Sequence, residues 1–446
     1  MKKYFFILFC SLIVSCSPDE KNVPSLITQS YTAEIGDLIT ITGTNLLQVE
    51  TVRIFSTEYN VSGATIYNKP GELLHHKFFT FHSDTEIQFV LPQLYAESYV
   101  MQIGTQEIPL RLIGFIPLFE DYPFDLQEIM GLKVLNDEEA LGTTRVDLPT
   151  RNLHLFKNGF YETQKISSNV QFFNVLENAD SWYAKSTDFK LYEIYYKSSS
   201  SPSYSFLNSF NTRDLDYLSM NPDNILITPE KQIFIFTQNG IFIKQNNELK
   251  KAVELFEGLE AYPKQERNIF DLKLTSQGNI HGKVILNPGA SSSDYEYAFI
   301  SMNPKNFTFN ISERLLSEPV GPQFKSSTGY FLLPRNKKLY KTIDSGLTWS
   351  ESATPIPYTD GYFYNAQIKV LDAQSILLFL HTSTNDKLPY TTVYKSSDGG
   401  DSWQLKKRFN HPRQVDLFLF QSDFANRSGL FYFTNFSSRQ LWKYLE

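Results

Sequence analysis

The fold is decided by an eight-residue stretch that occurs twice, first over residues 342–349 and again over residues 396–403. Written out, the two copies are Thr342-Ile343-Asp344-Ser345-Gly346-Leu347-Thr348-Trp349 and Ser396-Ser397-Asp398-Gly399-Gly400-Asp401-Ser402-Trp403. Both follow the pattern S/T-x-D-x-G-x-S/T-W, and each comes directly after an apolar residue, a Tyr and a Lys.

This spacing has a physical logic. An Asp placed after a strand can accept hydrogen bonds from backbone N–H groups further along its turn. The Gly two residues later can adopt the positive φ that folds the chain back. The Trp then begins the returning strand as a large apolar side chain with one polar atom. The stretch therefore predicts two strands joined by a tight turn, and its recurrence predicts a repeating β unit.

The pattern resembles the Asp-box of β-propellers, the BNR repeat of sialidases, some glycanases, sortilin-like receptors and photosystem assembly factors. In those families the box lies on an outer turn away from the ligand, so the resemblance implies a structural role. We expect both turns to stabilise the outer edge of a ring, and we expect ligand binding to survive the loss of either Asp. The residues given this role are Thr342, Asp344, Gly346, Trp349, Ser396, Asp398, Gly400 and Trp403.

The same order of strand, turn and strand recurs from about Gly114 onward, with an aromatic residue near the middle of each third strand. Those aromatic residues are Phe156, Tyr192, Phe242, Phe299, Tyr340, Tyr394 and Trp442. Their spacing of 36 to 57 residues is near the period of about 40–50 residues expected of propeller blades. We therefore predict a β-propeller over residues 114–446 with seven blades, although six or eight blades also fit. Closure of the ring would take a strand from residues 115–134.

Residues 24–113 alternate apolar and polar positions between turn signals, which is typical of half-buried antiparallel strands. The clearest stretch starts at Gly36, and its Ile39, Ile41 and Gly43 share one strand face. The run resembles the G-x-x-V-T-I-x-G-x-N pattern of IPT/TIG domains, which are immunoglobulin-like sandwiches. The resemblance implies a spacer or binding module, so the whole chain is predicted to be all-β, a sandwich followed by a propeller.

The chain begins with a basic segment, Met1–Lys3, and an apolar run, Tyr4–Val14. Such a run is too short to span a bilayer and is typical of a signal peptide. It ends in a sequence that resembles the bacterial lipobox, which implies cleavage after residue 15 and lipidation of Cys16. The acidic tether over 16–23 resembles the export signal of surface lipoproteins of Bacteroidetes. We expect an outer-membrane lipoprotein exposed at the cell surface, with a periplasm-facing orientation as the alternative.

Composition limits the chemistry further. The formal charge of −7 argues against a nucleic-acid partner, which would require a basic surface. Both cysteines of the chain, Cys10 and Cys16, lie in the first sixteen residues, so the remainder has no disulfide, thiolate nucleophile or cysteine–zinc site. The histidines outside the sandwich, at 154, 281, 381 and 411, lack metal-ligand spacing. We therefore expect no metal and no cofactor.

Known propeller enzymes can be compared with the chain. A sialidase would need an Arg-Ile-Pro near the first blade and further arginines to clamp a carboxylate, and the chain has no Arg-Ile-Pro. A glycanase needs two facing carboxylates. Asp271, Asp372 and Asp416 fall in or beside first strands, where such a pair could lie, but we interpret them as turn caps or solvated charges. No catalytic residue is assigned.

Binding is the remaining function. Aromatic rings stack on sugars while neighbouring polar groups bind the hydroxyls, and Trp182, Tyr362, Phe363 and Tyr364 are the candidate ligand-binding residues. We interpret the chain as a non-catalytic surface lipoprotein that binds a carbohydrate or a protein through its propeller. The alternatives are an extracellular glycoside hydrolase and an envelope assembly scaffold.

Overall fold

The computed structural model of this chain describes residues 23–56, 72–118, 129–147, 150–157, 162–176, 178–215, 224–237, 240–245, 248–252, 268–274, 278–285, 295–312, 315, 318–325, 327–334, 337–346, 348–352, 354–358, 363–384, 387–410, 421–425, 428–434 and 439–446. The chain divides into two compact units between Pro117 and Leu118. In the described ranges the helical segments are single 3-10 turns: η2 (Leu46–Gln48), η3 (His76–Phe78) and η4 (Thr212–Asp214). A search of these residues found no helix with the length and hydropathy of a membrane span.

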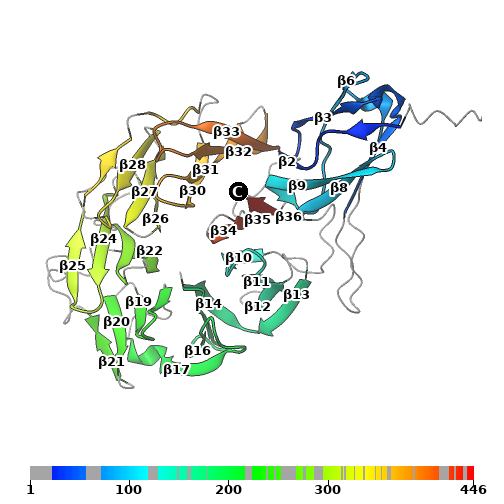
Figure 1. Cartoon of the computed structure of the whole chain (residues 1–446). Helices are drawn as coiled ribbons and strands as arrows, with labels where there is room; N and C mark the ends of the chain where they lie inside the picture. Colours follow the sequence, from blue (N-terminus) through cyan, green and yellow to red (C-terminus); the bar gives the residue numbers. More distant parts are fainter. Residues whose placement is uncertain are drawn as a thin grey trace, which may run out of the picture. The chain divides into compact units, whose positions relative to one another are not determined.

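The first unit is a sandwich of two sheets (Figure 1). One sheet has the strand order β1-β3-β7-β6, and the other has the order β5-β4-β8-β9 with β2 parallel to β9. The strands are β1 (Ser25–Leu26), β2 (Tyr31–Glu34), β3 (Leu38–Thr44), β4 (Thr51–Ser56), β5 (Glu72–His75), β6 (Phe81–His82), β7 (Glu86–Val90), β8 (Ser98–Ile103) and β9 (Gln106–Pro117).

Alternate residues of these strands fill the core of the sandwich. Ile39 and Ile41 on β3 are fully buried, and so is Ile87 on the paired strand β7. The residues between them, such as Thr40, are only partly buried, because successive side chains of a strand point to opposite faces. The antiparallel strands predicted from the alternation and the sandwich implied by the resemblance are confirmed, while membership of the IPT/TIG family stays a prediction.

The second unit is a β-propeller. Its described strands form seven sheets, six of four antiparallel strands each and a last one built on β34, β35 and β36. The first three blades are β10 (Ile129–Val134), β11 (Ala140–Asp147), β12 (Thr150–Lys157), β13 (Glu162–Ser167); β14 (Val170–Val175), β15 (Ser181–Lys185), β16 (Leu191–Lys197), β17 (Ser205–Asn211); and β18 (Asn224–Ile227), β19 (Ile233–Thr237), β20 (Gly240–Gln245), β21 (Glu248–Lys251).

The remaining blades continue the same order. They are β22 (Asn268–Leu274), β23 (Ile280–Ile285), β24 (Tyr297–Asn303), β25 (Thr308–Ile311); β26 (Val320–Lys325), β27 (Thr328–Leu333), β28 (Lys338–Thr342), β29 (Ser350–Glu351); β30 (Phe363–Val370), β31 (Ile376–Thr384), β32 (Lys387–Ser396), β33 (Gln404–Asn410); and β34 (Gln421–Ala425), β35 (Ser428–Thr434), β36 (Arg439–Leu445). The predicted count of seven blades is therefore confirmed for the described residues.

The blades close into a ring (Figure 1). First strands of neighbouring blades lie side by side, as β10 does with β14, β18 with β22 and β26 with β30. The first strand of the last blade, β34, lies against β10 of the first blade. The backbone N–H of Leu118 also donates to the carbonyl oxygen of Leu441 in β36, over 2.9 Å. The start of this unit thus returns to the last strand of the ring.

The third blade packs against a neighbouring blade on each of its two faces. Strand β19 shows why its sequence, Ile-Phe-Ile-Phe-Thr, is apolar throughout instead of alternating. Ile233 and Ile235 join the core between the second and third blades, whereas Phe234 and Phe236 join the core between the third and fourth. A strand buried on two faces needs apolar residues at every position.

Candidate functional site

The aromatic residues predicted to bind a ligand lie in different settings. Trp182 is in β15, is only 1% exposed, and packs among apolar side chains that include Ile194 and Phe242. Its indole ring presents no face to solvent. Phe363 and Tyr364 begin β30, where the backbone of Phe363 pairs with Thr382. Tyr362, like the predicted lipidation residue Cys16, lies outside the described residues.

The first Asp-box turn is built around one carboxylate. Asp344 Oδ1 accepts hydrogen bonds from the Thr342 hydroxyl at 2.6 Å and from the Thr348 N–H at 2.9 Å, and Oδ2 accepts from the Thr348 hydroxyl at 2.6 Å. The N–H of Gly346 donates to Thr342 Oγ1 at 3.0 Å, with φ of Gly346 at 85°. These bonds fix both ends of the turn to the side chain of Asp344.

The second turn repeats this hydrogen bonding. Asp398 Oδ1 accepts from the Ser396 hydroxyl at 2.8 Å and from the Ser402 N–H at 2.9 Å, and Gly400 N–H donates to Ser396 Oγ at 2.8 Å. The bonds to Asp398, first of all that from the Ser402 hydroxyl, lower the pKa of its carboxyl to about 2. Because the folded pKa lies below the unfolded one, this carboxyl stabilises the fold above about pH 4, and that contribution is lost as the pH falls toward 2.

The Trp of the first turn packs between two blades. Its ring lies 5.4 Å from that of Phe299 in β24 of the fourth blade, and 4.7 Å from that of Phe331 in β27 of the fifth. Neither Trp349 Nε1 nor Trp403 Nε1 has a hydrogen-bond partner among the described residues, although both atoms are buried. The indole of Trp349 therefore acts through its apolar surface.

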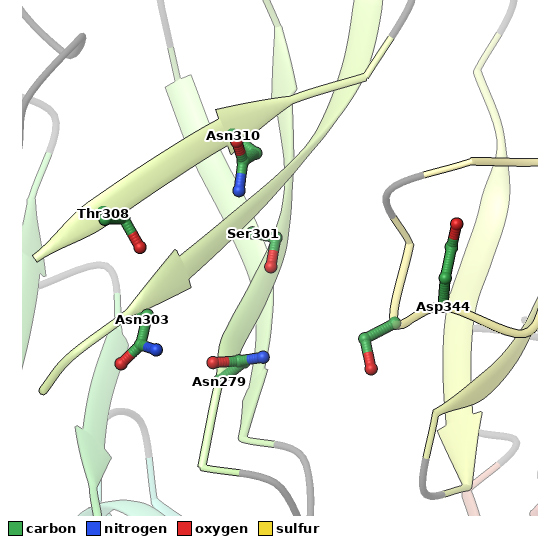
Figure 2. A pocket seen from close by; sticks show the side chains of 7 residues that line it. Asn279, Ser301, Asn303, Thr308, Asn310 and Asp344 are labelled. Carbon is green, nitrogen blue, oxygen red and sulfur yellow. The ribbon is translucent and has the colours of Figure 1, made fainter. Parts of the chain in front are cut away.

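A pocket of about 210 Å³ lies between the fourth blade and the first Asp-box turn. On one side is the β24–β25 hairpin, in which Ser301 pairs with Asn310 and Asn303 pairs with Thr308. Figure 2 shows these four side chains on the hairpin, with Asp344 on the turn across from them. All seven lining residues carry polar side chains: Asn279, Ser301, Asn303, Thr308, Asn310, Asp344 and Ser345.

A neutral histidine lies beside this lining. His281 in β23 pairs with Ser301, so their side chains share one face of the sheet. The imidazole is 3% exposed and stacks on Phe324 of the fifth blade, with ring centroids 4.3 Å apart. Burial lowers the pKa of His281 to about 4, so the ring is uncharged at neutral pH. The surroundings of the pocket thus contribute one carboxylate and no positive charge from this histidine.

The two turns differ at the residue after the Asp. Ser345 occupies this position in the first turn with φ of 60°, and Gly399 occupies it in the second with φ of 77°. The backbone N–H of each donates to the turn between the first two strands of its own blade, to Ser327 O at 2.9 Å and to Gln374 O at 2.8 Å. Both turns therefore impose the same left-handed backbone, and only the second uses glycine there.

Of the carboxylates considered for a hydrolase, the structure describes the side chain of Asp372. Asp372 Oδ1 accepts hydrogen bonds from the N–H groups of Gln374 and Ser375, at 2.8 and 2.7 Å, and so caps its turn. Asp271 lies in β22, and Asp416 is outside the described residues. Among the described residues, no group of three or more His, Cys, Asp or Glu side chains could hold a metal ion.

Sequence reasoning did not identify the pocket. Its hairpin residues are ordinary polar positions of outer strands, and nothing in their spacing shows that a turn from the next blade faces them. One signal was present: the first copy of the motif reads Asp-Ser-Gly where the second reads Asp-Gly-Gly. A serine where the second copy has glycine marks Ser345 for attention.

Asp344→Ala is expected to lower the free energy of unfolding by about 1–3 kcal/mol, because the Thr348 N–H and the Thr342 hydroxyl lose their acceptor. Asp398→Ala, the matched change in the second turn, is expected to destabilise as well. Urea unfolding of the full chain, followed by Trp fluorescence, measures both, since all four Trp residues lie in the propeller. Unchanged unfolding midpoints in both variants would contradict the structural role of the turns.

The two substitutions are expected to differ in their effect on ligand binding. Asp398→Ala is expected to leave binding intact, as the Asp-box resemblance implies. Asp344 lines the pocket, so its removal is expected to weaken binding in addition to stability, which revises the expectation from the sequence that binding survives the loss of either Asp.

Comparison with known proteins found similar structures but no matching sequence. No protein-family model and no curated protein sequence matches the chain. Its structure is similar to YCF48 from Cyanidioschyzon merolae, with 11% identity, a TM-score of 0.45, and coverage of 74% of this chain and 98% of the other. It is similar to the calcium-binding protein regucalcin from Agrobacterium tumefaciens, with 11% identity, a TM-score of 0.36, and coverage of 62% and 89%. An oligogalacturonate lyase in complex with manganese has 9% identity, a TM-score of 0.39, and coverage of 72% and 98%.

Proposed function

We propose that this chain is a non-catalytic, lipid-anchored protein of the outer membrane that binds a carbohydrate through its propeller. The observation that carries the proposal is the pocket beside the first Asp-box turn, whose lining is amide and hydroxyl groups with one carboxylate. Amides and hydroxyls both donate and accept hydrogen bonds, which suits the mixed donor and acceptor pattern of sugar hydroxyls.

The anchor and the location rest on the leader. Cys16 follows a lipobox-like sequence, and an acidic tether precedes the sandwich. A lipid on Cys16 would hold the sandwich and the propeller at the membrane surface, where the propeller is available to large glycans. Fractionation of cells that express Cys16→Ser tests the anchor, because the variant should leave the membrane fraction.

A protein partner is the second candidate, and one observation on the sandwich favours it. Leu38 of β3 and Val90 of β7 pair with each other and are 52% and 51% exposed. Phe81 of β6 pairs with Gln88 and is 48% exposed on the same face. Exposed apolar side chains gathered on one sheet face are typical of protein contacts.

The test is a glycan array probed with the full chain in mild detergent, followed by product analysis on every glycan that binds. We expect binding without release of sugar. Release of a shortened glycan would replace this function with a glycoside hydrolase. Absence of binding to every glycan would contradict the carbohydrate proposal and favour the protein partner or an assembly scaffold.

A further inference from the structure

Ser345 adopts a backbone conformation that favours glycine. Its φ of 60° lies in the left-handed region, which is sterically unfavourable for a residue that carries a Cβ. The second turn imposes the same conformation and places Gly399 there. Strain retained at one of two equivalent positions directs attention to a functional role for the side chain. Ser345 is 7% exposed, and it lines the pocket.

The surroundings of the second turn differ from those of Ser345. At the second turn, a Cβ added to Gly399 would lie 2.6 Å from Lys341 Nζ, and one added to Gly400 would lie 2.6 Å from Leu339 Cδ2. The Ser352 hydroxyl also donates to the carbonyl oxygen of Gly400 at 2.7 Å. Side chains of the fifth blade therefore pack directly against the backbone of the second turn.

The lining selects an uncharged ligand. Lysine and arginine are missing from the seven lining residues, so an anion such as a sialic acid or phosphate would meet no counter-charge there. The lining carboxylate of Asp344 already accepts three hydrogen bonds within its turn, which leaves it a poor ligand for a cation. Hydroxyl and amide groups remain, and they match a neutral polyhydroxy compound.

The size of the pocket limits how much of a glycan it holds. Its volume of about 210 Å³ is below the range of about 300–1,000 Å³ that is typical of sites for drug-sized ligands. One sugar ring is of the appropriate scale, whereas an oligosaccharide would extend from the pocket into solvent.

We propose that the first Asp-box turn, through Ser345, and the β24–β25 hairpin together bind one uncharged sugar residue. This inference rests on the proposed carbohydrate function and gives it a place and a ligand class. It also assigns the first Asp-box turn a binding role that the second turn does not share.

The test compares Ser345→Gly with the wild-type full chain. Glycine relaxes the backbone at this φ, so the variant should unfold at a temperature equal to or higher than that of wild type. It should bind the methyl glycosides of neutral hexoses and N-acetylhexosamines about tenfold more weakly, because it lacks the hydroxyl. Saturation-transfer NMR titrations with these glycosides measure the affinity, with methyl sialoside as the charged comparison.

Lys231→Gly is the matched control. Lys231 also has a positive φ, 65°, in a turn of the third blade, and it lies outside the pocket lining. Its replacement should relieve backbone strain in the same way and leave sugar affinity unchanged. Equal affinity of Ser345→Gly and wild type would overturn the inference while the array result keeps the carbohydrate function. Preference for the sialoside would also overturn it.

Discussion

Trp182→Ala is expected to lower the free energy of unfolding by about 3–5 kcal/mol, the range observed for removal of a large aromatic side chain from a core. The indole is 1% exposed and belongs to the core between the second and third blades. A cavity there loses contacts from both blades at once. With total stabilities of about 5–15 kcal/mol for a domain, such a loss is large. Urea unfolding followed by far-ultraviolet circular dichroism measures it.

Trp182→Phe provides the control for this prediction. Trp182 Nε1 has no hydrogen-bond partner among the described residues, so phenylalanine removes volume without breaking a hydrogen bond. We expect a much smaller loss of stability than with alanine, and unchanged sugar binding in the phenylalanine variant. A stable Trp182→Ala protein that no longer binds its glycan would show that the indole contacts ligand, as the sequence-based hypothesis holds.

The second large effect is the pH dependence of stability at His281. Burial lowers the pKa of His281 from 6.5 to about 4 in the folded protein. As the pH falls below 6.5, the unfolded chain binds a proton at this residue that the folded chain does not, so folding is penalised. The loss begins near pH 6.5 and levels off near pH 4. A difference of this size between the folded and unfolded pKa values corresponds to a loss of about 3 kcal/mol in the free energy of unfolding.

His281→Phe should remove this part of the pH dependence. Phenylalanine can keep the stacking on Phe324, and His281 Nε2 has no partner to lose. Unfolding midpoints of both proteins are compared at steps between pH 7.5 and pH 4. Carboxylates and the other histidines titrate in both proteins, so the widening difference isolates His281. Parallel curves would show that the folded protein protonates His281 as readily as the unfolded chain does.

Most of the fold could be predicted because the same weak pattern of strands and turns recurs in every blade, and the recurrence makes the prediction stronger than any one copy does. The seven aromatic residues aligned from the sequence, from Phe156 to Trp442, all lie in the third strand of their sheets. Trp182 shows the limit of such reasoning. A strand buried on both faces, such as β15, leaves no alternation to indicate which aromatic side chains reach solvent, so a core residue and a ligand-binding residue have the same local sequence.

The candidate site could not be predicted for a different reason. Its walls come from the β24–β25 hairpin of one blade and from the turn that holds Asp344 and Ser345 in the next. Whether a gap remains between such elements depends on side chains that fill it, as Leu339 and Ser352 do at the second turn. Two stretches with the same motif therefore have different surroundings, which neither copy reveals by itself.

The seam of the ring, where the start of the propeller meets its last strand, affects how the protein folds. The N–H of Leu118 and the carbonyl of Leu441 are bonded, although about 320 residues separate them, which makes this a contact of very high sequence separation. Blades can form as soon as their own strands are synthesised, because their pairings are local. The seam must wait until the last strand has emerged, and until then the strands that it will join are exposed to other chains. The interval between synthesis and closure is therefore the stage at which this protein is most prone to aggregate.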